Sequence, residues 1–155
     1  MNASPDRRHP LDIPPVYFLL AIAMMIALHH FLPIYRLLGP AWFYPGLLLI
    51  VGGVLLAVVA ERLFARAGTG VRPFTPSTAV VASGPYRFTR NPMYLGMMIV
   101  LLGGFLLSGR LGPILVIPVF FWWIHTRFVL REEVHMERAL GKDYLNYKRS
   151  VRRWL

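Results

Sequence analysis

The sequence contains no cysteine. Disulfide bonds, thiolate metal sites and thiol nucleophiles are therefore excluded. Acidic residues are scarce as well, with 7 Asp and Glu against 17 Lys and Arg, so the formal net charge is +10. Charged residues make up 15% of the chain and hydrophobic residues 56%, which is more apolar than an ordinary water-soluble domain. The composition indicates an integral membrane protein, and 155 residues suit a single domain over residues 1–155.

The positive charge needs an anionic partner. Nucleic acid is one such partner, but basic nucleic-acid-binding domains do not carry several long apolar segments. We therefore expect no nucleic acid and assign the charge to the headgroups of anionic membrane lipids.

Four apolar segments have the length to cross a membrane, at about residues 16–32, 44–64, 92–107 and 111–130. A hydrocarbon core of ~30 Å requires ~20 helical residues, so the first and third segments are at the short limit. Only the turn "SGRLG" separates the third from the fourth, which predicts a helical hairpin. The expected fold is an all-α bundle of about four transmembrane helices.

Basic residues gather on one side of this predicted bundle. Of the 17 Lys and Arg residues, only Arg36 and Arg110 fall in the two loops on the other side. The positive-inside rule then places both termini in the cytoplasm. No small-x-small cleavage site follows the first span, so it is not expected to be a signal peptide.

The stretch "GPYRFTRNPMYLG", residues 84–96, is polar although it leads into the third span. Asn91 suits the N-cap of a helix and Pro92 suits its first position. Arg87 and Arg90 have the charge to bind lipid phosphates. Three glycines near one face of the third span suit close helix packing: Gly96, Gly103 and Gly104.

The same stretch also permits ligand binding. A helix N-terminus beside two arginines attracts an anion. Tyr86 and Tyr94 add aromatic faces that suit a flat ring or a cation. Such a pocket would open at the cytoplasmic face of the membrane.

A second polar cluster, "HTRFVLREEVHMER", covers residues 125–138. On a continuous helix His125 and Glu132 share a face, and Arg127 and Arg131 are one turn apart. A solvated, charge-balanced helix face is the alternative interpretation. The spacing also permits, without requiring, metal ligation by three residues, and no metal is assigned: His125, Glu132 and His135.

The fourth helix is expected to continue to Leu140 and to end at Gly141. The last segment, "KDYLNYKRSVRRWL", is aromatic and basic. We expect it to form a helix on anionic lipid, with Tyr144, Tyr147 and Trp154 at the level of the headgroups.

Together the two clusters resemble the isoprenylcysteine carboxyl methyltransferases and the related bacterial and phospholipid methyltransferases. Their shared pattern is G-x-Y-x-x-x-R-H-P-x-Y-x-G, then two spans, then E-E-x-x-L-x-x-x-F-G-x-x-Y-x-x-Y. Here "GPYRFTRNPMYLG" and "EEVHMERALGKDYLNY" keep this spacing. Asn91 stands where the family usually has histidine, and Met136 and Leu140 replace Leu and Phe. The brevity of the chain favours a bacterial inner membrane.

The resemblance implies S-adenosylmethionine as the cofactor, bound at the cytoplasmic face. The residues implied as its contacts are Thr78, Val80, Val81, Tyr86, Asn91, Pro92, Met93, Tyr94 and Glu132. Val80 and Val81 would act through backbone groups. The carboxylate of the cofactor suits the start of the helix, and its ammonium or ribose hydroxyls suit Glu132, with Glu133 as a further candidate.

The methyl acceptor implied by the resemblance is lipophilic and enters between the spans. An isoprenylcysteine-type carboxylate needs an orienting cation, for which Arg127 or Arg131 is the candidate. A phospholipid amine needs a base instead, for which Glu133 or His125 is the candidate. An NADPH-dependent membrane reductase and a non-catalytic scaffold are the other hypotheses, and the oligomeric state is left open.

Overall fold

The computed structural model describes residues 12–32, 34–68 and 80–155. Helices lie at all four predicted spans: α1 (Pro14–Phe31), α2 (Phe43–Arg66), α3 (Pro92–Ser108) and α4 (Val116–Ile124). A π-helical turn, His125–Val129, joins α4 to α5 (Leu130–Leu140), and α6 (Lys142–Ser150) follows. The described residues form no sheet, so the predicted all-α membrane bundle is confirmed.

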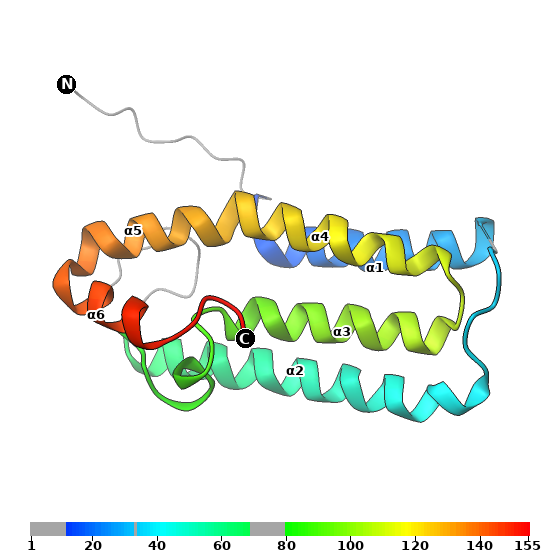
Figure 1. Ribbon diagram of the computed structural model, residues 1–155, viewed down its shortest axis with the longest axis horizontal. Helices are drawn as coiled ribbons and strands as arrows, with labels where there is room; N and C mark the ends of the chain where they lie inside the picture. The colour runs from blue at the N-terminus through cyan, green and yellow to red at the C-terminus, as the bar shows by residue number, and fades with distance from the viewer. Residues whose placement is uncertain (1–11, 33, 69–79) are drawn as a thin grey trace, which may run out of the picture.

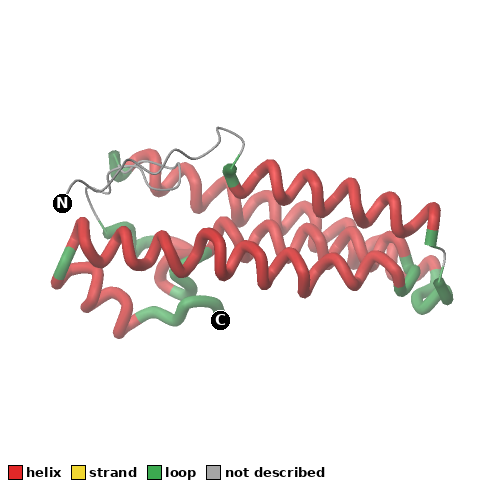
Figure 2. The backbone as a smooth tube through the Cα atoms, turned by 90° about the horizontal axis from the view of Figure 1, so that it is seen from above, coloured by secondary structure: helices red, strands yellow, loops and turns green. Residues whose placement is uncertain are grey.

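Figure 1 shows how these helices are arranged. α4 and α5 run as one long helix along the top, α2 and α3 lie side by side below it, and α1 lies behind α4. The second view shows α5 extending past the ends of the other helices, with α6 turning back (Figure 2). Three described stretches are long and apolar enough to cross a membrane: Pro14–Phe31, Pro40–Arg66 and Gly112–Leu140. α3 is apolar but shorter, with 17 residues.

Glycine pairs hold α2 against α3. A Cβ atom at Gly53 would lie 2.6 Å from the carbonyl oxygen of Gly96, and one at Gly96 would lie 2.6 Å from that of Gly53. Gly46 and Gly103 form the same reciprocal contact, seven residues along each antiparallel helix. Hydrogen side chains let the two backbones approach closely, which maximises dispersion contacts. Gly104 is not on this face, because its Cβ position lies 3.6 Å from Met25 of α1.

The main core lies between α1, α3 and the long helix. Its most deeply buried members include Leu101, Ile124 and Phe128, which are at most 1% exposed. The outer faces of the helices carry many exposed large apolar side chains, as expected of surfaces that contact lipid.

The long helix is not a regular α-helix throughout. The N–H of Leu130 bonds to the carbonyl of His125, five residues back, which is the hydrogen bond of a π-helix. A π-turn accommodates one more residue than an α-turn. The shared face predicted for His125 and Glu132 on a continuous helix is therefore wrong, because the turn changes the register between them.

The C-terminal segment is also placed differently from the prediction. Tyr144 and Tyr147 are 4% and 8% exposed, and the Tyr147 hydroxyl donates a hydrogen bond to the Tyr86 carbonyl at 2.7 Å. Trp154 packs against the main core, with its ring 5.1 Å from that of Phe121. These aromatic residues therefore pack against protein, and the expected position at the lipid headgroups is wrong for them.

Candidate functional site

The two polar clusters meet where α3 begins. The last residues of the chain lie along the loop before α3 and connect it to α5 and α6. The Arg90 amide donates to the Arg152 carbonyl at 2.9 Å, and the Thr89 hydroxyl donates to the Arg153 carbonyl at 3.0 Å. The C-terminal residues therefore hold the loop before α3, which carries the first half of the family-like pattern, close to α5 and α6, which carry the second half.

Asn91 precedes α3, as its N-cap position predicts, but its side chain does not cap the helix. The Nδ2 atom of Asn91 donates to the Arg153 carbonyl at 2.9 Å, and its backbone N–H donates to the Thr89 hydroxyl oxygen at 3.2 Å. The amide is buried, at 9% exposure. Asn91 thus ties the start of α3 to the C-terminal segment.

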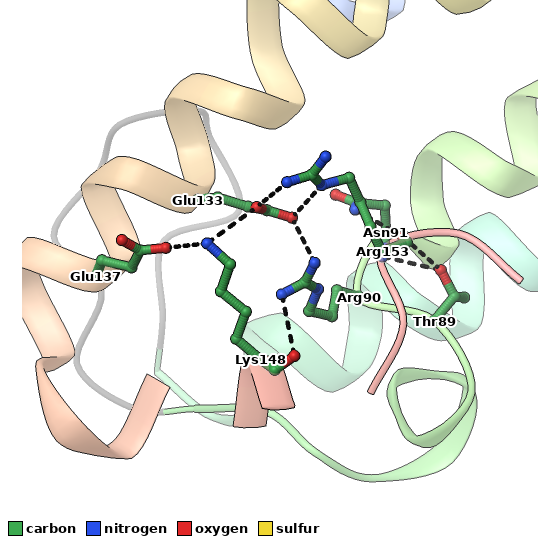
Figure 3. Close-up of polar contacts among 7 residues, drawn as sticks. All are labelled: Thr89, Arg90, Asn91, Glu133, Glu137, Lys148 and Arg153. Carbon is green, nitrogen blue, oxygen red and sulfur yellow. Dashed lines mark hydrogen bonds and ion pairs between the residues drawn. The ribbon is translucent and has the colours of Figure 1, made fainter. Parts of the chain in front are cut away.

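Glu133 is the centre of an ion cluster (Figure 3). Arg153 binds it with two hydrogen bonds of 2.8 Å, and a guanidinium nitrogen of Arg90 lies 3.1 Å from Oε1. Lys148 lies 3.7 Å from the other oxygen and also pairs with Glu137. Because its hydrogen bond to Glu133 stabilises the charged form, the pKa of Arg153 is raised.

This cluster corrects one prediction and weakens another. The Arg90 side chain is only 7% exposed, so it balances Glu133 rather than binding lipid phosphate as expected. Glu133 is 5% exposed and faces three cations, which stabilise its ionised form. The geometry therefore favours a structural role for Glu133 over the role of base.

Glu132 lies next to this cluster in sequence but has different partners. Its Oε1 atom accepts a hydrogen bond of 2.7 Å from the Tyr94 hydroxyl on α3. Tyr94 is buried and Glu132 half-buried. Within the described part of the chain no cation pairs with Glu132. The pair thus presents an oriented carboxyl group that has no charge partner among the described residues.

Tyr86 and Val81 pack on α2. The Tyr86 ring lies 5.3 Å from that of Phe64, and both Tyr86 and Val81 belong to a small core that also contacts Met93. Burial raises the pKa of Tyr86 above its usual value and raises that of Tyr147 to about 12, against a smaller opposing effect of Arg90. Both hydroxyls therefore keep their protons at neutral pH and act as donors.

The remaining predicted residues are spread over the site. Pro92 is buried at the start of α3, Val80 is half-buried before it, and Thr78 lies outside the described residues. Arg127 pairs with Asp12 at 2.7 Å. Arg131 is exposed, and no acidic side chain that the structure describes pairs with it.

His125 sits apart from the ion cluster. Its ring stacks on Phe121 at 5.7 Å and lies 6.1 Å from the ring of Trp154. The His125 Nδ1 and Trp154 Nε1 atoms are buried without a hydrogen-bond partner in the described structure.

Sequence reasoning missed Arg153, Trp154 and Asp12 as parts of this region. The basic residues at the end of the chain suit an anionic lipid and a buried glutamate equally well, so composition alone does not separate the two. Asn91, directly before the third span, was a usable signal of a further contact, because the side-chain amide of an asparagine there needs a hydrogen-bond partner.

Comparison with known sequences identifies the chemistry. The model of the family described as phospholipid methyltransferase matches residues 42–143, which is well over half of the chain. The chain belongs to this family. The matched residues include the start of α3, Arg90, Glu132 and Glu133, whereas Lys148 and Arg153 of the ion cluster lie beyond the matched range.

Two relatives of this methyltransferase share parts of its sequence. An uncharacterized protein of Haemophilus influenzae is 36% identical over 63 residues, which are 41% of this chain and 100% of that protein. The Protein-S-isoprenylcysteine O-methyltransferase of Schizosaccharomyces pombe is 28% identical over 72 residues, 46% of this chain and 30% of the yeast protein. No solved structure matches the chain significantly.

The resemblance to membrane methyltransferases is thus confirmed. The apolar helices and the family together show a methyltransferase of the membrane.

Proposed function

We propose that this membrane methyltransferase uses S-adenosylmethionine and holds the cationic part of that cofactor against Glu132 and Tyr94. The observation that carries the proposal is the partner set of Glu132: one tyrosine hydroxyl at 2.7 Å and, among described residues, no cation. An unpaired carboxylate away from bulk water is costly, so a cationic ligand would stabilise it. The neighbouring Glu133 has three cations and needs none.

The start of α3 suits the other end of the cofactor. Because α3 begins at Pro92, the amides of Met93 and Tyr94 lie before the first internal hydrogen bonds of the helix. Such amides attract a carboxylate. Thr78, Val80 and Val81 are proposed to contact the cofactor, the two valines through backbone groups. Bound S-adenosylmethionine would supply a methyl group on a positively charged sulfur.

Asn91 and Tyr86 support the site in this proposal. Asn91 fixes the Arg153 carbonyl, and Tyr86 accepts a hydrogen bond from Tyr147 at its own carbonyl. Both hold the segment before α3 in place, so the amides at the helix start keep a fixed direction.

For the acceptor we favour a lipophilic carboxylate of the isoprenylcysteine type. The name of the yeast relative supports this class, and a carboxylate needs no general base. Arg131 is the better orienting cation, since Arg127 is already paired with Asp12. A phospholipid amine is the second candidate, supported by the family description. In that reaction we propose His125 as the base, because its Nδ1 atom has no hydrogen-bond partner among the described residues.

The cofactor is tested by calorimetric titration of S-adenosylmethionine and S-adenosylhomocysteine into the purified full chain in detergent. We expect saturable binding, weakened about tenfold or more by Glu132→Gln and by Tyr94→Phe. Glu137→Gln is the matched control, because Glu137 pairs with Lys148 outside the proposed pocket. A folded wild-type protein that binds NADPH instead would replace the proposal with the reductase hypothesis. Binding of neither would favour a scaffold.

The acceptor is tested with a labelled methyl donor. The protein is supplied in turn with a farnesylated cysteine analogue and with phosphatidylethanolamine vesicles, and the labelled product is treated with alkali. A methyl ester releases labelled methanol under these conditions, whereas an N-methyl group does not. Alkali-stable label on the phospholipid would favour the amine, and Arg131→Ala should then have little effect.

A further inference from the structure

A groove lies at the end of the bundle opposite the methyltransferase site. It has a volume of about 470 Å³ and is lined by α1, α2 and α3, including Ile22 and Ile26 of α1 and Ile50 of α2. Its floor includes Leu101 and Gly104 of α3. Gly104 carries no side chain to fill the space, and its nearest neighbour across the groove is the Met25 methyl group. The volume and the largely apolar lining of the groove suit an acyl chain.

Two arginines lie together beyond the end of this groove. Arg36 and Arg110 form an isolated antiparallel bridge between the two loops at that end. The Leu37 amide bonds to the Gly109 carbonyl at 2.8 Å and the Leu111 amide to the Tyr35 carbonyl at 3.2 Å. This is the pattern around a non-hydrogen-bonded pair, in which the two opposing side chains come closest.

Like charges directly opposite one another are destabilising. No acidic residue occurs in residues 31–60 or 92–131, so the sequence offers these arginines no carboxylate at this end of the molecule. Arg36 Nε donates to the Leu38 carbonyl at 3.3 Å, and an external anion bound by both guanidinium groups would reduce their repulsion.

The loop that carries Arg110 also adjoins the groove. Ser108 and Pro113, on either side of this loop, line the groove, and His29 lines it from α1. The Nδ1 atom of His29 is buried and has no hydrogen-bond partner in the described structure. The apolar groove is therefore lined by His29, and the loop that carries Arg110 adjoins it.

We propose that this groove binds one phospholipid with an anionic headgroup, its acyl chain against Leu101 and Gly104 and its phosphate between Arg36 and Arg110. His29 lies where the ester oxygens of the glycerol backbone would fall. Cationic pockets between membrane helices select anionic lipids by this combination of charge and apolar surface. The site is independent of the proposed function, since Tyr94 and Ser108 are separated by about 20 Å along α3.

The test measures how much phospholipid stays bound to the full chain in detergent. The protein is equilibrated with mixed micelles of phosphatidylglycerol and phosphatidylcholine, repurified, and its lipid is quantified by mass spectrometry. We expect phosphatidylglycerol to be retained in preference. The double variant Arg36→Ala with Arg110→Ala should weaken its binding by about tenfold or more. Gly104→Leu should displace it by filling the groove.

Each variant has a matched control. Arg62→Ala with Arg66→Ala removes the same charge from exposed positions at the other end of α2. Gly52→Leu adds the same side chain where a Cβ atom meets nothing within 4 Å. Both controls should retain phosphatidylglycerol, and binding of S-adenosylmethionine should be unchanged in all variants. Equal retention of the two lipids, or equal loss in the charge variant and its control, would show ordinary boundary lipid and overturn the proposal.

Discussion

Asn91 shows how one residue can fit a local rule and still be used for something else. It occupies the N-cap position before α3, yet its amide donates to a carbonyl 62 residues away, that of Arg153. An N-cap preference reflects what a side chain can do within its own helix turn. A nearby backbone acceptor, brought by tertiary folding, competes for the same donor.

We expect Asn91→Ala to lower the free energy of unfolding by about 1 kcal/mol, because the buried Arg153 carbonyl loses one of its two side-chain donors. Thermal unfolding in detergent measures the change. Asn91→His keeps a ring N–H donor and should lose less. The control is Asn146→Ala at an exposed position of α6, and an equal loss there would contradict this role of Asn91.

The two glutamates that pair with Lys148 should differ strongly. Glu133→Gln leaves the buried Arg90 guanidinium without its charge partner, which costs about 3 kcal/mol. Glu137→Gln removes a peripheral pair, since the Lys148 and Glu137 side chains are 34% and 31% exposed, and should cost less than about 1 kcal/mol. Chemical denaturation of both variants gives the comparison. Similar midpoints would mean that the cluster is not a stabilising centre.

At the scale of elements, the contact between α2 and α3 follows most directly from the sequence. Gly96 and Gly103 were predicted to pack closely, and they meet Gly53 and Gly46 of α2. The sequence alone does not show that Gly104 faces a different helix from Gly96 and Gly103. The spacing of three glycines within nine residues does not indicate which of them contacts α2 and which contacts α1. The location of α1 decides the division.

We expect Gly53→Leu to destabilise the protein by at least about 2 kcal/mol, because its side chain would collide with the backbone of α3. Gly52→Leu, at the adjacent position, has open space and should be nearly neutral. Circular dichroism during heating measures both. Equal stability of the two variants would show that α2 and α3 do not cross at the glycine pairs.

The π-turn is an element that no pattern in the sequence predicts. Its hydrogen bonds differ from those of an α-helix by one residue, and the apolar spacing of α4 remains compatible with either. The π-turn matters for the site, because it changes the angle around the helix axis between the side chains of His125 and Glu132. The side chains that α5 directs toward α3 are set by this one turn.

At the scale of the whole molecule, the distribution of charge predicts orientation. Fifteen of the 17 basic residues flank one side of the spans, and the positive-inside rule places that side in the cytoplasm. The chain has no natural cysteine, so single introduced cysteines report accessibility without background.

We expect a membrane-impermeant maleimide to label Gly39→Cys in intact cells and to label Leu155→Cys only after the membrane is opened. Gly39 has nothing within 4 Å of its Cβ position, and Leu155 is 76% exposed, so neither change disturbs packing. Labelling of Leu155→Cys in intact cells would reverse the orientation.

The sequence by itself determined the helices, the membrane and the family-like pattern, because apolar length and local spacing are properties of contiguous residues. The family-like pattern also includes Glu132 and Tyr94, but it does not predict the hydrogen bond between them. Only the tertiary structure decided that Glu133 is neutralised by Arg90 and Arg153, while Glu132 meets no cation among the described residues. The physical reason is that the charge balance of a carboxylate depends on which distant segments fold against it, and here the end of the chain returns to the start of α3.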